Sequence, residues 1–122
     1  MTTRRKRVGD SGERLAARYL TSQGYRIVAR NVRRREGEID LVTLDGDTLV
    51  FVEVKLRRAG AFGGASEALT AAKHRRLRAL AEAYAAEHPE LPGQQRIDLV
   101  AIDLGPDGVL REVRHIRSAV EG

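Results

Sequence analysis

Residues 37–56, with the sequence GEIDLVTLDGDTLVFVEVKL, predict the β-hairpin around which the rest of the fold is arranged. Two runs of residues, 38–44 and 48–56, have the alternating apolar and polar character of strands. Between them stands Asp45-Gly46, a dipeptide that is typical of two-residue hairpin turns. The segment therefore predicts two antiparallel strands joined by a tight turn.

The alternation along these strands sorts the side chains onto two faces. If Asp45 and Gly46 form the loop, Glu38 lies opposite Glu53, and one face carries four charged residues: Glu38, Asp40, Glu53 and Lys55. The other face is then aliphatic throughout: Ile39, Leu41, Val50, Val52, Val54 and Leu56. A shift by one residue would bury the charges, so the hydrophobic pattern supports this register. A three-residue loop would reverse the parity unless a bulge restored it.

Three carboxylates on one face repel one another, and one lysine cannot neutralise them. A hard divalent cation such as Mg²⁺ can, because it prefers carboxylate oxygens together with water and phosphate. We expect Asp40 and Glu53 to hold the metal, with Glu38 as an additional ligand or a group behind it. Lys55 would orient the attacking water or offset negative charge on a phosphate. The competing interpretation is an ordinary surface ion pair worth about 1 kcal/mol or less.

The elements outside the hairpin are predicted from helical and strand periodicity. A helix starts near Asp10 or Ser11 and stops at Gly24, and a second runs from Thr70 as N-cap to residue 87. The second helix buries a face made of Leu77, Leu80, Ala81 and Tyr84. Further strands are expected at 26–32, 97–104 and 109–116. The order α-β-β-β-α-β-β predicts an α/β fold, a mixed central sheet of about five strands flanked by helices.

The composition limits the class of protein. A chain of 122 residues fits one domain, here 9–119, preceded by a basic tail at 1–8. The absence of cysteine excludes disulfides and thiolate zinc sites. No apolar run approaches the roughly 20 residues that span a bilayer, and the basic start is not followed by the apolar stretch of a secretory signal. We therefore expect no membrane partner and a cytoplasmic location.

Positive charge is concentrated in the first third of the chain. Residues 1–35 hold eleven Lys or Arg and two acids, a balance of +9, so the remainder sums to −4 against the total of +5. The clusters at 4–7 and at Arg33, Arg34 and Arg35 favour a polyanion such as nucleic acid. A solvated tail and a charged turn explain the same clusters, and the sequence leaves both interpretations open.

Three residues outside the hairpin need separate treatment. Glu13 and Lys73 each allow two interpretations, and Asp98 could support a neighbouring residue. Glu13 lies three residues after Asp10, which is the spacing of a capping box, yet it also heads an apolar stripe that could face the sheet. Lys73 extends the buried face of the second helix, where it could reach a phosphate or simply extend its ammonium group into solvent. Asp98 could support Arg96 and is not placed in the metal site.

In these motifs the chain resembles the restriction-endonuclease-like (PD-(D/E)xK) nuclease superfamily. More closely, it resembles the bacterial YraN/UPF0102 family, which is similar to archaeal Holliday-junction resolvases. The resemblance covers about 9–119 and is most specific at 37–40 and 51–55. Further matching pieces are Gly12-Glu13 with Ala16, Asn31, Phe62-Gly63, Lys73 with Arg76-Leu77, and Arg96-Ile97-Asp98. Two features depart from the pattern: Ile39 replaces the proline of the superfamily name, and 116–120 lacks an Asn and a terminal aromatic residue.

The resemblance implies a restriction-endonuclease-like domain and assigns roles within it. Asp40, Glu53 and Lys55 correspond to the superfamily's catalytic triad, and Glu13 matches a helix carboxylate that joins such sites. The implied activity is a metal-dependent endonuclease that hydrolyses phosphodiester bonds in DNA, including branched or damaged DNA. The implied cofactor is Mg²⁺ or Mn²⁺, and the implied partners are DNA rather than RNA and a second copy of the chain, because cleaving a junction needs two sites. The residues expected to touch nucleic acid are Lys73, Arg33, Arg34, Arg35 and Arg76.

Two other functions remain open from the residues alone. A non-catalytic nucleic-acid-binding protein could keep the nuclease-like fold and its acids without turnover. An adaptor subunit could use the acidic face to bind a basic protein. Only the enzyme requires a metal and loses cleavage when Asp40 or Lys55 is replaced.

Overall fold

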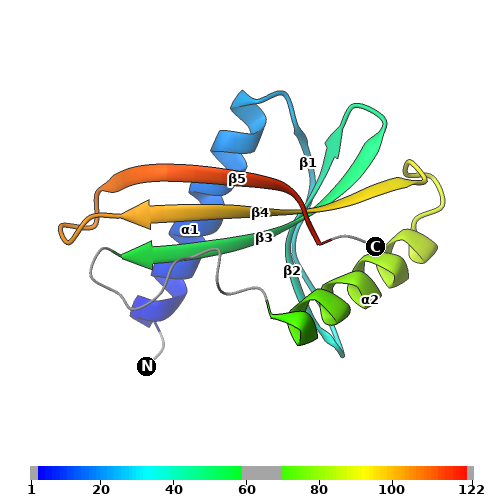
Figure 1. Cartoon of the computed structure of the whole chain (residues 1–122), viewed down its shortest axis with the longest axis horizontal. Helices are drawn as coiled ribbons and strands as arrows, with labels where there is room; N and C mark the ends of the chain where they lie inside the picture. The colour runs from blue at the N-terminus through cyan, green and yellow to red at the C-terminus, as the bar shows by residue number, and fades with distance from the viewer. Residues whose placement is uncertain (1–2, 59–69, 121–122) are drawn as a thin grey trace.

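The computed structural model describes residues 3–58 and 70–120, with side chains from residue 12 onward (Figure 1). The elements follow the predicted order α-β-β-β-α-β-β, so the α/β class with a mixed five-stranded sheet is confirmed. Their bounds are α1 Thr3–Ser22, β1 Arg26–Arg34, β2 Gly37–Asp45, β3 Thr48–Arg58, α2 Ala71–Glu87, β4 Gln94–Leu104 and β5 Leu110–Val120. Within these ranges no helix has both the length and the apolar character needed to cross a bilayer.

The strands stand in the sheet in their chain order, β1-β2-β3-β4-β5. All neighbouring pairs are antiparallel except β3 and β4, which are parallel. A parallel pair needs a long crossover connection, and α2 provides it here. The crossover helix brings Lys73, in its first turn, within 3.5 Å of Glu53 on β3.

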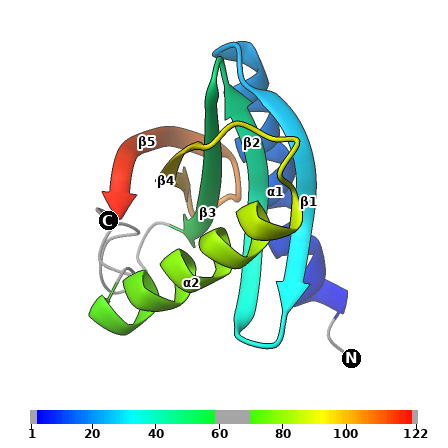
Figure 2. The same cartoon turned by 90° about the vertical axis from the view of Figure 1, so that its right-hand side faces the viewer.

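The two helices cover opposite faces of the sheet (Figure 2). On the α1 face, Ala16, Ala17 and Leu20 pack against sheet residues Leu41, Val50, Val52, Val100 and Ile102. On the α2 face, the helix contributes the four residues predicted to be buried, Leu77, Leu80, Ala81 and Tyr84, against Ile39, Val42, Leu49, Phe51 and Ile97. Each helix buries one stripe, as a three-layer arrangement requires.

The first helix is longer than predicted. It begins at Thr3, not near Asp10 or Ser11, so residues 3–8 of the predicted tail are helical. The glycines and serine at 9–12 suggested a start, but the preceding arginines and lysine are good helix formers and extend the helix. Glu13 consequently lies well inside α1, and the interpretation of Glu13 as part of a capping box is wrong. For α2, the N-cap was correctly predicted: the Thr70 hydroxyl accepts a hydrogen bond from the Lys73 N–H at 3.2 Å.

The hairpin turn lies one residue later than predicted. Asp45 pairs with Thr48, so the two-residue loop is Gly46-Asp47, with Gly46 at a φ of 58° that favours glycine. Every cross-strand partner is displaced by two residues, which keeps the predicted parity because side chains repeat every two residues. Val42 therefore pairs with Phe51, where the predicted register gave Leu49.

The predicted aliphatic face is interrupted at one position. Leu41 and Val52 lie on the α1 face, but Ile39 belongs to the cluster on the α2 face. Strict alternation would put Ile39 and Leu41 on the same side, so β2 changes sidedness at Asp40. The ladder between β2 and β3 also ends here, at the pair Leu41 and Val52. The prediction for Ile39 is therefore wrong. The prediction that all four charged residues share one face is wrong as well, because Glu38 groups with Glu13 of α1 whereas Glu53 contacts Lys73 of α2.

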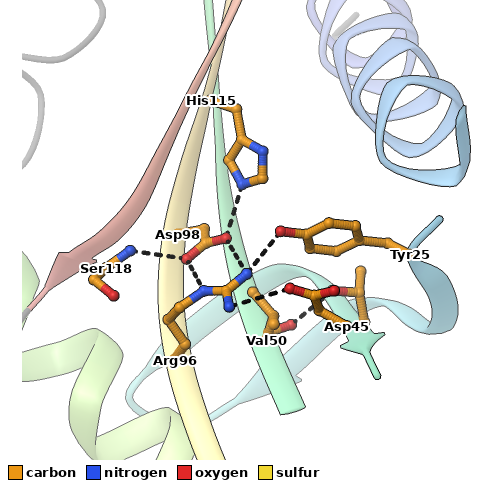
Figure 3. A network of polar contacts seen from close by, with 8 residues as sticks. Tyr25, Asp45, Val50, Arg96, Asp98, His115 and Ser118 are labelled. Carbon is orange, nitrogen blue, oxygen red and sulfur yellow. Dashed lines mark hydrogen bonds and ion pairs between the residues drawn. The ribbon is translucent and has the colours of Figure 1, made fainter. Parts of the chain in front are cut away.

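A buried ion network joins β4, β5 and the hairpin (Figure 3). The fully buried Asp98 accepts hydrogen bonds from Arg96 at 2.8 Å, from the Ser118 N–H at 3.0 Å, and contacts His115 at 2.8 Å. Arg96 also reaches Tyr25 and Asp45. The prediction that Asp98 supports Arg96 is confirmed.

Candidate active site

The site forms where β2 separates from β3. Beyond the last ladder pair, the Asp40 side chain takes over the role of a backbone acceptor: its Oδ2 accepts a hydrogen bond from the Val54 N–H at 2.7 Å. This bond ties one carboxylate oxygen to the neighbouring strand. The sheet itself therefore holds the Asp40 carboxylate in place, at the point where β2 separates from β3.

A group of three carboxylates surrounds this point. Oxygens of Glu13, Glu38 and Asp40 all lie within 4.8 Å of one another, and each residue is half-buried. Glu13 comes from α1, which approaches the sheet closely because Gly12 packs against the side chain of Leu56. Glu38 and Asp40 come from β2. Hard carboxylate oxygens at this spacing suit Mg²⁺ or Mn²⁺, and we call Glu13, Glu38 and Asp40 the acidic triad.

Two lysines stand on the neighbouring strand and helix. Glu53, of which only 9% is exposed, lies 3.8 Å from the Lys55 Nζ and 3.5 Å from the Lys73 Nζ, both measured to its Oε1. Lys55 is on β3, and Lys73 is in the first turn of α2. A single buried carboxylate thus holds two ammonium groups beside the acidic triad.

The acidic neighbours perturb the pKa of Asp40. Burial and the charge of Glu53 raise it from an ordinary 3.8 to about 7, and Glu13 and Glu38 add to the rise, against the opposing hydrogen bond from Val54. The charge of Glu53 therefore acts on Asp40 although Glu53 is not a member of the acidic triad. A cation bound among these carboxylates would offset their mutual repulsion and favour the ionised form of Asp40.

The pKa of Lys55 is lowered. Burial is the largest cause, and the neighbouring Lys73 ammonium is the second, while Glu53 and Asp40 act in the opposite direction. Two like charges share one partner, so Lys55 gives up its proton more readily than a free lysine. Such a lysine can orient a water molecule during a reaction.

The predicted site residues fall into two adjoining groups. Asp40, Glu38 and Glu13 form the acidic triad, whereas Glu53 and Lys55 form the second group. The pair expected to share the metal, Asp40 and Glu53, is thus divided between them. Lys73 joins the second group. Its position one turn before Leu77 had left two possibilities open, an ammonium group near the site or one extended into solvent.

The arginines that were predicted to touch nucleic acid differ in their contacts. Arg33 Nε is 3.8 Å from Glu38, while Arg34 forms an ion pair with Glu87 at the end of α2. Arg35 and Arg76 are exposed, and Arg76 lies against Gly37 at the start of β2. Arg34 is therefore engaged in joining β1 to α2, whereas Arg33 contacts Glu38 and Arg76 lies beside the start of β2. The Phe62-Gly63 motif lies outside the described residues.

Comparison with known proteins identifies related chains over most of the length. Residues 12–102 match the family described as "Uncharacterised protein family UPF0102". A UPF0102 protein from Symbiobacterium thermophilum is 56% identical over 106 residues, which cover 87% of this chain and 90% of the relative. UPF0102 proteins from Roseiflexus castenholzii and Frankia alni are 48% and 46% identical, and the alignments cover 99% and 92% of this chain and 98% and 92% of the relatives.

Proposed function

The chain belongs to the UPF0102 family, and we propose that its site hydrolyses phosphodiester bonds in DNA with a divalent metal ion. The observation that supports this most strongly is the convergence of three carboxylates from α1 and β2 beside two lysines on one buried glutamate. Acids alone would suit many cations. Acids beside ammonium groups suit a metal and an anionic substrate bound together.

In this proposal the acidic triad holds Mg²⁺ or Mn²⁺, with Glu53 as a further oxygen donor. The residues fit such an ion, since their oxygens cluster within 4.8 Å and Asp40 ionises only reluctantly without a cation beside it. A bound divalent ion would supply Lewis-acid stabilisation of phosphate charge and lower the pKa of water.

The lysines would act on the phosphate and on water. The Lys73 ammonium would face the negative charge that develops on the phosphate oxygens, and Lys55 would orient the attacking water. Glu53 holds both lysines and so sets their positions. The bond from the Val54 N–H to Asp40 already fixes that carboxylate, so little rearrangement would be required during the reaction.

The proposed substrate is DNA, including branched or damaged DNA, cut by an enzyme that acts as a homodimer on junctions. Support comes from Arg33 beside Glu38, from the exposed Arg35 and Arg76, and from the overall charge of +5. Basic side chains around an acidic centre attract the phosphate backbone while leaving the metal ligands free to bind their ion.

The test is an incubation of the protein with linear, flapped and four-way DNAs in Mg²⁺ and in Mn²⁺. We expect metal-dependent cleavage by the wild type and losses of about a hundredfold or more in Asp40→Asn, Lys55→Ala and Lys73→Ala. Asp47→Asn is the matched control, because Asp47 is an exposed acid of the same hairpin. It should cleave like the wild type.

The same panel separates the alternative functions. Binding that persists in all variants, with no cleavage in either metal, would contradict the proposal and identify a non-catalytic nucleic-acid-binding protein. Indifference to both DNA and metal would instead favour an adaptor whose acids bind a basic protein.

A further inference from the structure

A basic pocket lies between α1 and β1, on residues that the active site does not use. It has a volume of about 400 Å³ and is lined by Arg14, Ala17, Arg18, Thr21, Ser22 and Arg30. Arg14 and Arg18 are one turn apart on α1, so they stand on the same side of the helix, and Arg30 comes from β1. We call this hollow the arginine pocket.

Among the residues whose side chains the structure describes, no acid pairs with the three guanidinium groups of this pocket. Arg14, Arg18 and Arg30 are exposed, and none of them forms an ion pair with any acid in the part of the chain that the structure describes. By contrast, Arg34, Arg57 and Arg96 each have an acidic partner. Three unpaired arginines around one hollow repel one another, and an anion bound among them would remove that repulsion.

The composition of the pocket favours a nucleotide over a bare anion. Ala17, the methyl group of Thr21 and the aliphatic parts of the arginines provide apolar surface between the charged groups. The Thr21 hydroxyl can donate to a phosphate or sugar oxygen, whereas the Ser22 hydroxyl already donates to the Tyr19 carbonyl at 2.6 Å. A volume of about 400 Å³ is more than one phosphate needs and leaves room for the attached sugar.

The pocket also stands at a useful distance from the acidic triad. Glu13 and Arg18 are five residues apart on the same helix, which at about 1.5 Å per residue is roughly 7.5 Å along the axis. Five residues also turn the helix by about 140° beyond a full turn, so Arg18 and Glu13 lie on different sides of α1. A strand whose backbone crosses the acidic triad and then passes around α1 would bring a neighbouring phosphate to the pocket.

We propose that the arginine pocket binds a backbone phosphate of the nucleic-acid substrate and fixes the position of the strand relative to the acidic triad. This inference rests on the proposed function for the identity of the substrate, but the pocket's contribution to binding can be measured without cleavage. Arg14, Arg18 and Arg30 neutralise the phosphate, and the apolar surface takes the sugar.

The test measures binding of a labelled four-way DNA and a labelled single strand by fluorescence anisotropy in EDTA, where no metal-dependent cleavage can occur. The variant is Arg18→Ala with Arg30→Ala. The control is Arg58→Ala with Arg111→Ala, which removes the same charge from exposed arginines beside the β4–β5 turn. We expect Kd to rise about tenfold or more for the pocket variant and much less for the control.

A second measurement asks whether a phosphate is involved. The slope of log Kd against log salt should fall by about 1 in the pocket variant, as expected for one lost phosphate contact, and remain near the wild-type value in the control. Inorganic phosphate or a nucleoside monophosphate at millimolar concentration should not displace the labelled strand from the protein. Thermal unfolding should show that both double variants fold.

The outcomes separate this inference from the proposed function. Equal losses in the two double variants, or binding of free phosphate in the pocket with unchanged DNA affinity, would overturn the role of the pocket even if DNA is cut. A selective loss in the pocket variant would support it even if no DNA is ever cleaved.

Discussion

Asp40 combines a cost for folding with a central place in the proposed function. Its carboxylate is half-buried, near three other carboxylates, and has a pKa raised to about 7. In the unfolded chain the same group ionises near 3.8. Between these values the folded protein keeps a proton that the unfolded chain has lost, so the free energy of unfolding falls as pH rises. The stabilisation is complete below pH 3.8 and is lost as pH passes through 7.

Replacing Asp40 with Asn should therefore stabilise the metal-free protein at alkaline pH. The amide carries no charge, and its oxygen can still accept the hydrogen bond from Val54. We expect Asp40→Asn to exceed the wild type by about 2 kcal/mol in free energy of unfolding at pH 8, with the gap narrowing toward pH 5. Urea unfolding in EDTA at both pH values measures this. Asp47→Asn should show no such gap, and a less stable Asp40→Asn protein at pH 8 would contradict the argument.

At the scale of elements, the strands are joined by different interactions at the two ends of the sheet. At one end β2 leaves β3, and the Asp40 carboxylate replaces a ladder bond. At the other end Asp98 on β4 binds Arg96, His115 and the Ser118 N–H, and so connects β4 to β5 and, through Arg96, to the hairpin and Tyr25 (Figure 3). The first group of contacts lies in the candidate site, whereas the second links the strands to one another.

The Asp98 network should therefore matter for stability and not for metal binding. Burial disfavours the Asp98 carboxylate, yet Arg96, Ser118 and His115 outweigh that effect and hold its pKa below the ordinary range. We expect Asp98→Ala to lower the free energy of unfolding by about 3–5 kcal/mol, because Arg96 and His115 lose a buried partner. Asp98→Asn should lose less, and Asp47→Ala almost nothing.

Urea unfolding at pH 7 ranks these variants. Because the pKa of Asp98 is lowered in the folded state, its contribution is present above its unfolded pKa and is lost only as pH falls below that range. A loss under about 1 kcal/mol in Asp98→Ala would show that the network contributes little to stability.

At the scale of the whole molecule, the candidate metal site joins elements that the sheet alone does not hold together. Glu13 is on the helix of one face, Glu38 and Asp40 are on β2, and Lys73 is on the helix of the other face (Figure 2). A ligand bound at this point would therefore bridge α1 and the sheet. Binding to the folded chain alone raises its stability by mass action.

Metal should accordingly stabilise the protein in a pH-dependent manner. The metal needs the ionised Asp40, so we expect binding to release close to one proton below pH 6 and fewer above pH 8, with affinity rising across that interval. Calorimetry with Mn²⁺ in two buffers of different ionisation enthalpy counts the protons. Thermal unfolding should show a rise in Tm with metal at pH 8.

Glu13→Gln tests whether α1 contributes to that site. We expect it to weaken Mn²⁺ binding by about tenfold and to reduce the rise in Tm, while Glu112→Gln, an exposed acid on β5, leaves both unchanged. Unaltered affinity in Glu13→Gln would restrict the metal site to the strands.

The local pattern of the chain determined the strands, the second helix with its Thr70 cap, and the charged residues of the hairpin. It could do so because alternation, turn dipeptides and caps are short-range signals. The local pattern did not determine the exact hairpin register, because Asp45-Gly46 and Gly46-Asp47 both allow a two-residue loop with the same parity.

Only the tertiary structure decided which charged groups meet. Strand β2 changes face between Ile39 and Leu41, and at this point the Asp40 carboxylate accepts a hydrogen bond from the Val54 N–H. Glu13 and Lys73 enter the site because each helix packs its apolar stripe on the sheet and carries one polar residue to the strand ends. Such encounters depend on how layers pack across tens of residues of sequence, and no short-range pattern records that packing.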